Sequence, residues 1–166
     1  MKVTLIATVS ANGRVLLATN PNHQVPQNVL GFFVQKGMAA GNLVLGYTTY
    51  SLFADMLKGP LEGKEMVVLS KHHSVQEGHT VVASPREAIQ YLEAKGIQEI
   101  IVAGGVEIYK AFLEEDLVTD VYLNVAPMVV GDGGILGPQH DDLFIRFGKL
   151  SCEPVCDNII RLHLSK

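Results

Sequence analysis

Short apolar runs of strand length alternate along this chain with segments whose apolar residues recur at helical spacing. The runs show no polar alternation, which is typical of strands covered on both faces in a largely parallel sheet. They lie at residues 3–7, 43–46, 66–70, 81–82 and 99–103. The pattern therefore predicts an α/β protein with a buried central sheet.

Two later segments alternate between apolar and polar residues instead. Val121, Leu123 and Val125 alternate with polar neighbours, and the same pattern recurs over residues 160–164. Such alternation predicts half-exposed strands, and an antiparallel pair near the C-terminus suits both segments.

Helix signals lie between the predicted strands. Ser84, Pro85 and Glu87 combine a capping box with proline at the first helical position, and Gly96 predicts the end of that helix. A second helix is predicted over residues 26–38. Thr48 or Thr49 is expected to cap a short third helix, and a fourth follows a pair of glycines. With these helices on both faces of the sheet, we expect a three-layer αβα sandwich.

Length and composition narrow the function classes. The 166 residues suit one domain spanning 1–166, and the net charge of −4 argues against a nucleic-acid partner. No apolar run approaches the ~20 residues of a membrane span, and the N-terminus has no signal-peptide pattern. We therefore expect a cytoplasmic protein that acts on a small molecule. The histidines and acids lack metal-ligand spacing, so no metal site is predicted.

The most informative segment runs from Ile100 to Tyr109. A buried strand runs into Gly104 and Gly105 and turns at once into a helix. Glycine lets a ligand approach the backbone, and the N–H groups of the next helix favour a phosphate. Ligand crevices of open α/β sheets lie outside such strand ends. A nucleotide is expected here, although a tight turn without a ligand would show the same pattern.

Four blocks, in this order and spacing, are similar to the dihydrofolate-reductase-like fold and, within it, to the riboflavin-pathway reductase family. The opening strand and its Asn12-Gly13 loop form the first block, and Gly46-Tyr47-Thr48-Thr49 ends the second. The third block ends at Ser70-Lys71. The fourth joins Ala103-Gly104-Gly105 to the segment Ala126-Pro127 through Gly131 and Gly133. This resemblance implies a mostly parallel sheet with a C-terminal antiparallel hairpin, and a homodimer.

The resemblance also implies hydride transfer from NADPH, a cofactor that supplies the chemistry while the protein aligns the reactants. In folate reductases the peptide between the paired glycines is cis. The positions implied for cofactor binding are Ala7, Thr8, Gly46, Thr48, Thr49, Ser70, Lys71, Gly104, Gly105, Val106, Ile108 and Tyr109. Ser70 and Lys71 would meet the adenosine 2′-phosphate, and Ala7 and Thr8 the nicotinamide amide.

The chain departs from both families at the expected acids. Asn28 stands where folate reductases have a carboxyl group, counted from Pro26, and Asn12 replaces the riboflavin-type aspartate. An amide cannot supply a proton, so ordinary dihydrofolate reduction is not expected. Asn12, Asn28 and Glu107 are the candidate polar groups of the substrate pocket.

Each candidate has a structural alternative. For Glu107 the alternative is to complement a helix dipole, for Lys71 to be a solvated surface residue, and for Asn28 to be an ordinary residue at a helix start. For Thr48 and Thr49 it is to cap a helix only, and for Tyr109 to pack in the core only.

The sequence therefore predicts an NADPH-dependent reductase, similar to 5-amino-6-(5-phosphoribosylamino)uracil reductase. The alternatives are a dihydrofolate reductase with a displaced acid, or an inactive nucleotide- or pterin-binding protein.

Overall fold

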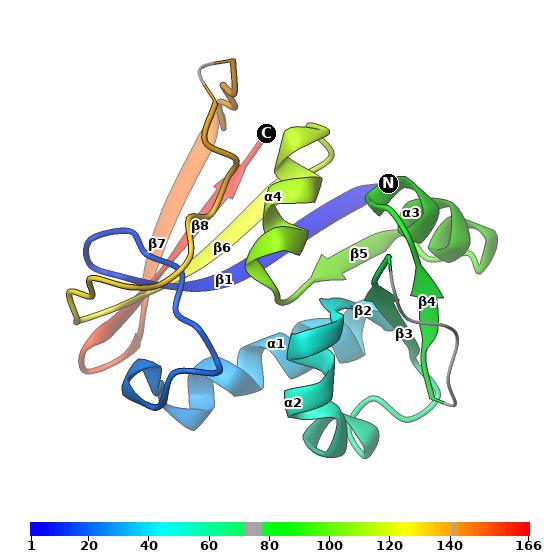
Figure 1. Cartoon of the computed structure of the whole chain (residues 1–166), viewed down its shortest axis with the longest axis horizontal. Coiled ribbons are helices and arrows are strands. Elements are labelled where there is room, and N and C mark those ends of the chain that lie inside the picture. Colours follow the sequence, from blue (N-terminus) through cyan, green and yellow to red (C-terminus); the bar gives the residue numbers. More distant parts are fainter. Residues whose placement is uncertain (72–77, 141) are drawn as a thin grey trace.

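A computed structural model describes residues 1–71, 78–140 and 142–166. The chain forms one eight-stranded sheet in the order β4-β3-β2-β5-β1-β6-β8-β7 (Figure 1). The first six strands of this order pair in parallel, and β8 pairs antiparallel with both β6 and β7. The fold is therefore the dihydrofolate-reductase-like sheet with a C-terminal antiparallel hairpin.

The strands are β1 (Lys2–Ser10), β2 (Asn42–Gly46), β3 (Glu65–Leu69), β4 (Thr80–Val82), β5 (Glu99–Val102), β6 (Asp120–Ala126), β7 (Lys149–Cys156) and β8 (Ile159–Ser165). The helices are α1 (Gln27–Ala40), α2 (Tyr47–Lys58), α3 (Pro85–Ala94) and α4 (Val106–Glu114), with the short 3-10 helix η1 (Pro21–His23) before α1. The predicted strands are confirmed, with ends that shift by a few residues. The partner strand β7 was not located by the sequence pattern.

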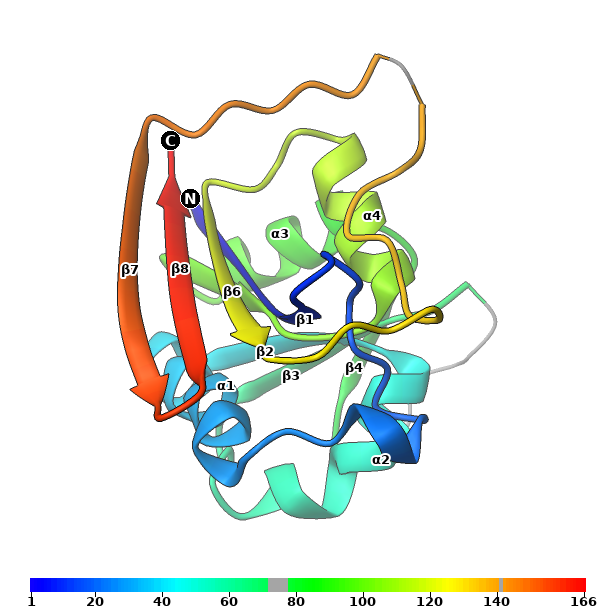
Figure 2. The same ribbon diagram turned by 90° about the vertical axis from the view of Figure 1, so that its left-hand side faces the viewer.

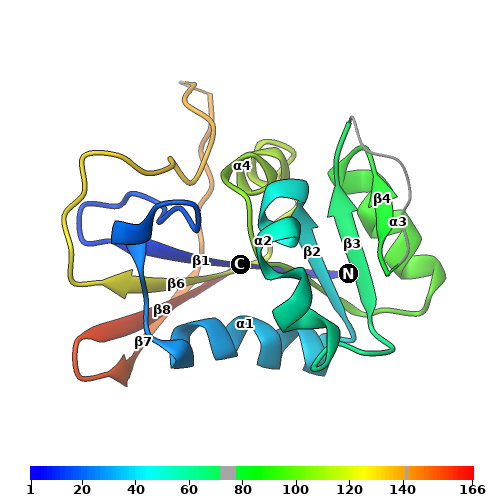
Figure 3. The ribbon, with the colours of Figure 1, turned by 60° about the horizontal axis from the view of Figure 1, so that its bottom comes forward.

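The helices cover opposite faces of the sheet (Figure 2). From β1 to β3 the chain moves along the sheet in one direction, and from β4 to β6 it moves in the other. Because parallel crossovers are right-handed, α1 and α2 lie on one face, and α3 and α4 lie on the other. Figure 3 shows α1 along its face with α2 beside it. The predicted three-layer sandwich is confirmed.

Each face has its own apolar core. Leu92 of α3 and Phe112 of α4 pack with Leu5 and Val102 on one side, and all four are fully buried. On the other side, residues of α2 and the loop after it pack against the opposite faces of β1, β2 and β5. This double coverage explains why the central strands read as continuous apolar runs.

The predicted helix caps are only partly correct. Ser84 caps α3 by accepting a hydrogen bond from the Glu87 N–H at 3.2 Å. Thr48 and Thr49 do not cap α2, because this helix begins at Tyr47 and its N-cap residue is Gly46. Both threonines therefore lie in the first helical turn.

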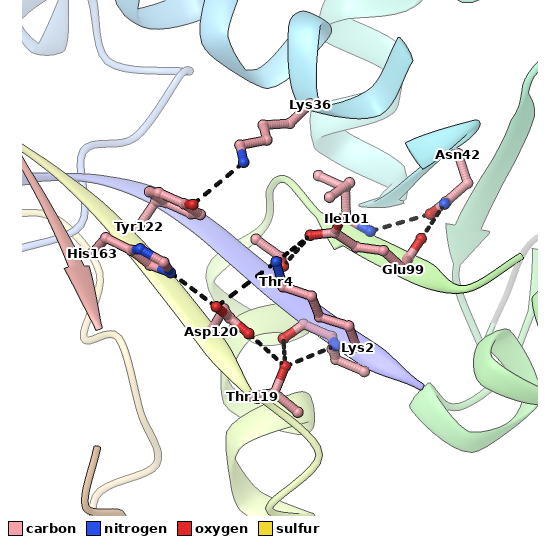
Figure 4. Close-up of polar contacts among 11 residues, drawn as sticks. Lys2, Thr4, Lys36, Asn42, Glu99, Ile101, Thr119, Asp120, Tyr122 and His163 are labelled. Carbon is pink, nitrogen blue, oxygen red and sulfur yellow. Dashed lines mark hydrogen bonds and ion pairs between the residues drawn. The ribbon is translucent and has the colours of Figure 1, made fainter. Parts of the chain in front are cut away.

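The amino ends of the central strands carry a network of paired polar groups (Figure 4). The buried Asn42 side chain bridges β2 and β5, donating to the Glu99 carbonyl at 2.6 Å and accepting from the Ile101 N–H at 3.1 Å. The Glu99 carboxylate accepts from Thr4 at 2.7 Å and pairs with Lys2 at 3.1 Å. These side chains satisfy one another and close this end of the sheet.

Asp120 extends the network to the antiparallel strands. Its carboxylate accepts from the Thr119 hydroxyl at 2.8 Å and contacts the His163 imidazole at 2.9 Å. The His163 ring in turn stacks on Tyr122 with centroids 4.1 Å apart, as Figure 4 also shows.

Candidate functional site

A crevice lies at the carboxyl ends of β2 and β5, where these neighbouring strands send their helices to opposite faces of the sheet. The Gly46 N–H donates to the Gly104 carbonyl at 2.9 Å, and the Ala103 N–H donates to the Val44 carbonyl at 2.9 Å. The N-termini of α2 and α4 therefore begin side by side. Such a switch point is where open α/β sheets bind ligands, and two helix N-termini there favour an anion.

Both predicted glycines are required by the geometry of this junction. Gly105 has φ of 97°, in the region that favours glycine. A Cβ atom on Gly104 would lie 2.6 Å from the Thr49 methyl carbon. The glycines thus let the two helix starts pack closely. The peptide between them is trans, unlike the cis peptide of folate reductases.

A cavity of about 630 Å³ opens over this junction. Ten predicted site residues line it, namely Thr8, Gly46, Thr48, Thr49, Gly104, Gly105, Val106, Glu107, Ile108 and Tyr109. They come from the ends of β1, β2 and β5 and from the first turns of α2 and α4. The structure therefore brings the two predicted strand-to-helix junctions into one site.

The strand β1 extends past the end of β5 along one wall. Its pairing with β5 ends at Leu5, whereas its pairing with β6 continues to Ser10. Beyond that point the Tyr109 hydroxyl donates to the Ile6 carbonyl at 2.6 Å, and the Leu16 N–H donates to the Thr8 carbonyl at 2.9 Å. Burial raises the pKa of the Tyr109 hydroxyl, so this group stays protonated and acts in packing.

The opposite wall is a loop, residues 11–26, of which the sequence analysis assigned only Asn12 to the site. Its Val15 pairs with Gly134 through backbone hydrogen bonds of 2.8 and 2.9 Å. The buried His23 ring accepts from the Leu17 N–H at Nδ1, which leaves the proton on Nε2 to meet Asp132 at 3.1 Å. Both ring nitrogens are thus engaged in holding the wall.

Asp132 holds this loop in place through its contacts with Asn20 and His23. Partial desolvation acts to raise its pKa, but hydrogen bonds from His23 and Asn20 outweigh this effect and hold the pKa below its ordinary value. Asn20 donates to the Asp132 carboxylate at 2.6 Å. A signal for this wall was present in the apolar run Val15-Leu16-Leu17-Ala18, which follows a strand without belonging to it.

Comparison with known proteins agrees with this geometry. A family model described as dihydrofolate reductase matches residues 2–139. The chain belongs to the dihydrofolate reductase family. No curated protein matches the chain.

Solved structures of this fold include proteins from riboflavin biosynthesis. A riboflavin biosynthesis protein from Shewanella sp. PV-4 has a TM-score of 0.75 at 21% identity, covering 99% of this chain and 98% of that one. RibD from Acinetobacter baumannii has a TM-score of 0.78 at 17% identity, and this chain, covered to 99%, spans 57% of it. A pyrimidine reductase-like protein from Corynebacterium diphtheriae has a TM-score of 0.70 at 17% identity, covering 99% and 91%.

Two of the predicted polar groups do not line the cavity of this family member. Asn12 accepts from Ser10 at 2.6 Å and donates to the Val130 carbonyl at 2.9 Å, so it fastens the turn after β1. Asn28 is exposed and donates to the Val155 carbonyl at 3.3 Å. The alignment on Pro26 predicted the start of α1 correctly. It did not predict which side chains of this helix face the cavity.

Leu30, Phe33 and Val34 are the residues that α1 contributes to the cavity. Leu30, two positions after Asn28, lines the cavity from the beginning of α1, and its side chain has no proton to give. Within the described residues, Glu107 is the one carboxylate in the lining. Its side chain is 82% exposed and pairs with Lys110 at 2.8 Å, which agrees with a role at the helix start.

The other predicted contacts lie beside the cavity. Ala7 is buried in the core under α3 and α4. Ser70 and Lys71 directly follow Leu69, which lines the cavity at the end of β3. The Ser70 N–H donates to the Val82 carbonyl at 3.0 Å, and Lys71 is exposed.

Two further properties concern the described part of the chain. It holds no helix that is both long and apolar enough to cross a membrane. It also holds no group of three or more His, Cys, Asp or Glu side chains placed to share a metal ion. His72, His73 and Asp141 lie outside the described residues.

Proposed function

We propose that this protein is a nicotinamide-dinucleotide-dependent reductase with NADPH as its cofactor. The observation that carries the proposal is the meeting of the α2 and α4 N-termini at one switch point, with Gly46 and Gly104 joined by a 2.9 Å hydrogen bond. Backbone N–H groups of Thr48, Thr49 and Val106 would hold the phosphates. Bound NADPH would supply a hydride.

The residues of the chain would bind and orient the reactants. Thr8 and the Tyr109 ring form the wall of β1 and α4, and the loop over residues 11–26 shields the other side from water. Among the described lining residues, the Tyr109 hydroxyl and both His23 nitrogens are already engaged. Water at the open mouth would therefore supply the proton that reduction requires.

The family resemblance makes 5-amino-6-(5-phosphoribosylamino)uracil the first acceptor to test. Loss of absorbance at 340 nm on mixing it with NADPH and enzyme would support this substrate, and no NADPH consumption at high enzyme concentration would contradict it. Dihydrofolate reduction is the alternative, and tight methotrexate binding would favour it. Tight NADPH binding without turnover of either acceptor would indicate an inactive binding protein.

Cofactor choice gives a sharper test. Lys71 follows β3 at the edge of the cavity, where its ammonium group would pair with the adenosine 2′-phosphate. We expect NADPH to raise the unfolding midpoint more than NADH does, because selective binding stabilises the folded state. Lys71→Met should remove this difference, and Lys64→Met, in the loop before β3, should not. Equal shifts with NADPH and NADH in the unaltered protein would contradict the NADPH preference.

The expected homodimer also stays a proposal. The outer edge of β7 has no neighbouring strand among the described residues, and Leu150 on this strand is 65% exposed. Sedimentation equilibrium would determine the oligomeric state.

A further inference from the structure

The loop over residues 11–26 and the helices α1 and α2 line the cavity mainly with apolar side chains. The large hydrophobic ones include Leu16, Leu30, Phe33, Leu52, Phe53 and Met56. The same loop also contributes the polar side chains of Thr19, Asn20 and Gln24. The Asn20 amide donates to Asp132, and the buried His23 ring has both nitrogens engaged. An acceptor placed here would lose most of its water.

Two of these side chains are exposed at the mouth. Leu52 is 51% exposed and Met56 is 40% exposed, one helical turn apart on α2. Large apolar side chains grouped at the rim of a cavity mark a surface that a ligand covers, since covering them removes apolar area from water. The rim therefore continues the apolar character of the interior.

The charges of the lining argue against an anionic acceptor. No lysine or arginine lines the cavity in the described part of the chain, and the seven residues outside that part contain neither type. Glu107 carries the one carboxylate among the described lining residues, and such a group would repel an anion. A phosphate or carboxylate buried without a cation carries a large desolvation penalty. The anion-binding elements are the two helix N-termini, which a dinucleotide would occupy.

We propose that the acceptor is an uncharged, largely apolar molecule that carries no phosphate, bound between the loop over residues 11–26 and the α1 and α2 side chains. This inference rests on the proposed reductase function, because the helix N-termini are assigned to the dinucleotide. It predicts that 5-amino-6-(5-phosphoribosylamino)uracil, the acceptor that the family resemblance suggests testing first, is not the substrate.

Binding can be tested without turnover. The neutral, polarity-sensitive dye prodan serves as the probe, and its fluorescence is titrated against the protein with saturating NADP⁺. We expect saturable binding, and no displacement by millimolar 5-amino-6-(5-phosphoribosylamino)uracil. Leu52→Lys should weaken prodan binding by about tenfold, equivalent to a loss of roughly 1.4 kcal/mol of apolar contact. Leu150→Lys, at a more exposed leucine on β7 outside the cavity lining, is the control and should change affinity less than about twofold.

The outcomes separate this inference from the proposed function. If calorimetry shows that NADP⁺ does not bind, this result counts against the proposed reductase function. The apolar site would then be tested separately, by prodan binding to the protein without NADP⁺. The inference is overturned if prodan does not bind, if Leu52→Lys and Leu150→Lys act alike, or if the phosphorylated pyrimidine binds more tightly than its dephosphorylated form.

Discussion

The two ends of the parallel sheet are built from the same strands but with opposite chemistry. At the carboxyl ends of β2 and β5, backbone N–H groups and apolar side chains surround an open cavity. At the amino ends, Lys2, Glu99 and Asn42 are joined to one another and to the backbone, as seen in Figure 4. The carboxyl end therefore offers groups that a ligand could contact, whereas the polar groups of the amino end bind one another.

The difference indicates that binding and stability are assigned to separate places in this fold. Polar side chains at the amino end replace strand pairing where β2 and β5 diverge, since these strands share a single registered pair, Val44 with Val102. At the carboxyl end the strands stay joined by the Gly46–Gly104 and Ala103–Val44 hydrogen bonds, and the crevice opens where their helices leave to opposite faces of the sheet. Changes at the amino end should therefore lower stability without altering ligand affinity, whereas changes at the carboxyl end should alter both.

The largest effect is expected for Asn42→Ala. This substitution leaves the buried Ile101 N–H and the Glu99 carbonyl without their side-chain partner. The free energy of unfolding should fall by about 2–5 kcal/mol, measured by urea denaturation, because each unsatisfied buried group is costly. NADPH affinity of the folded protein should be unchanged.

Asn158→Ala, in the exposed turn between β7 and β8, is the control and should change stability by less than about 0.5 kcal/mol. A loss of NADPH affinity in Asn42→Ala, measured at a temperature where the variant is folded, would contradict the separation of the two ends.

Gly104→Ala should have an intermediate effect at the other end. The added methyl group would meet the Thr49 methyl carbon, so α2 or α4 must shift, at about 1–3 kcal/mol. NADPH affinity should fall as well, since both helix starts line the cavity. Thr49→Ser removes the clashing methyl and should restore much of the stability in the double variant. Additive losses in the double-mutant cycle would contradict the packing explanation.

The smallest expected effect is the pH dependence of stability that Glu99 contributes at the amino end of the sheet. Partial burial acts to raise the pKa of Glu99, but the hydrogen bond from Thr4 and the Lys2 ammonium outweigh it, so the pKa lies below its ordinary value of 4.5. A lowered pKa stabilises the fold above the unfolded value, and this stability is lost as the pH falls through the folded value. Thermal melts from pH 6 down to about pH 3 should therefore show a steeper loss in the unaltered protein than in Glu99→Gln.

The expected difference is less than about 1 kcal/mol, since the Glu99 pair is partly exposed. Glu114→Gln, on the exposed side of α4, should follow the unaltered protein. Identical pH profiles for Glu99→Gln and the unaltered protein would show that this carboxylate does not contribute.

Much of the fold could be predicted from sequence because its signals are local. The apolar runs identify the buried strands, and Ser84 with Glu87 identifies the start of α3. Gly104 and Gly105 located the crevice for the same reason, since a strand that meets glycine and then a helix has few possible geometries. The start of α2 was misjudged because Gly46 at the strand end is its N-cap.

The polar residues of the site could not be predicted in the same way. Asn12 and Asn28 are in the expected segments, but tertiary contacts with Val130 and Val155 turn them away from the cavity. The wall formed by residues 11–26 depends on His23 and Asp132, which are 109 positions apart. No local sequence pattern indicates such a distant contact. Similarly, the orientation of α1 about its axis determines that the Leu30 side chain faces the cavity and the Asn28 side chain does not.

The loop over residues 11–26 is joined to β1 by the Val9–Val15 bridge and the bond from the Leu16 N–H to the Thr8 carbonyl. It is joined to the segment after β6 by the Val15–Gly134 pairing and the His23–Asp132 contact. The helix starts that would hold a dinucleotide belong to α2 and α4 and are separate from this loop. Residues 11–26 are therefore the segment to exchange with a relative when acceptor specificity is to be changed and dinucleotide binding kept.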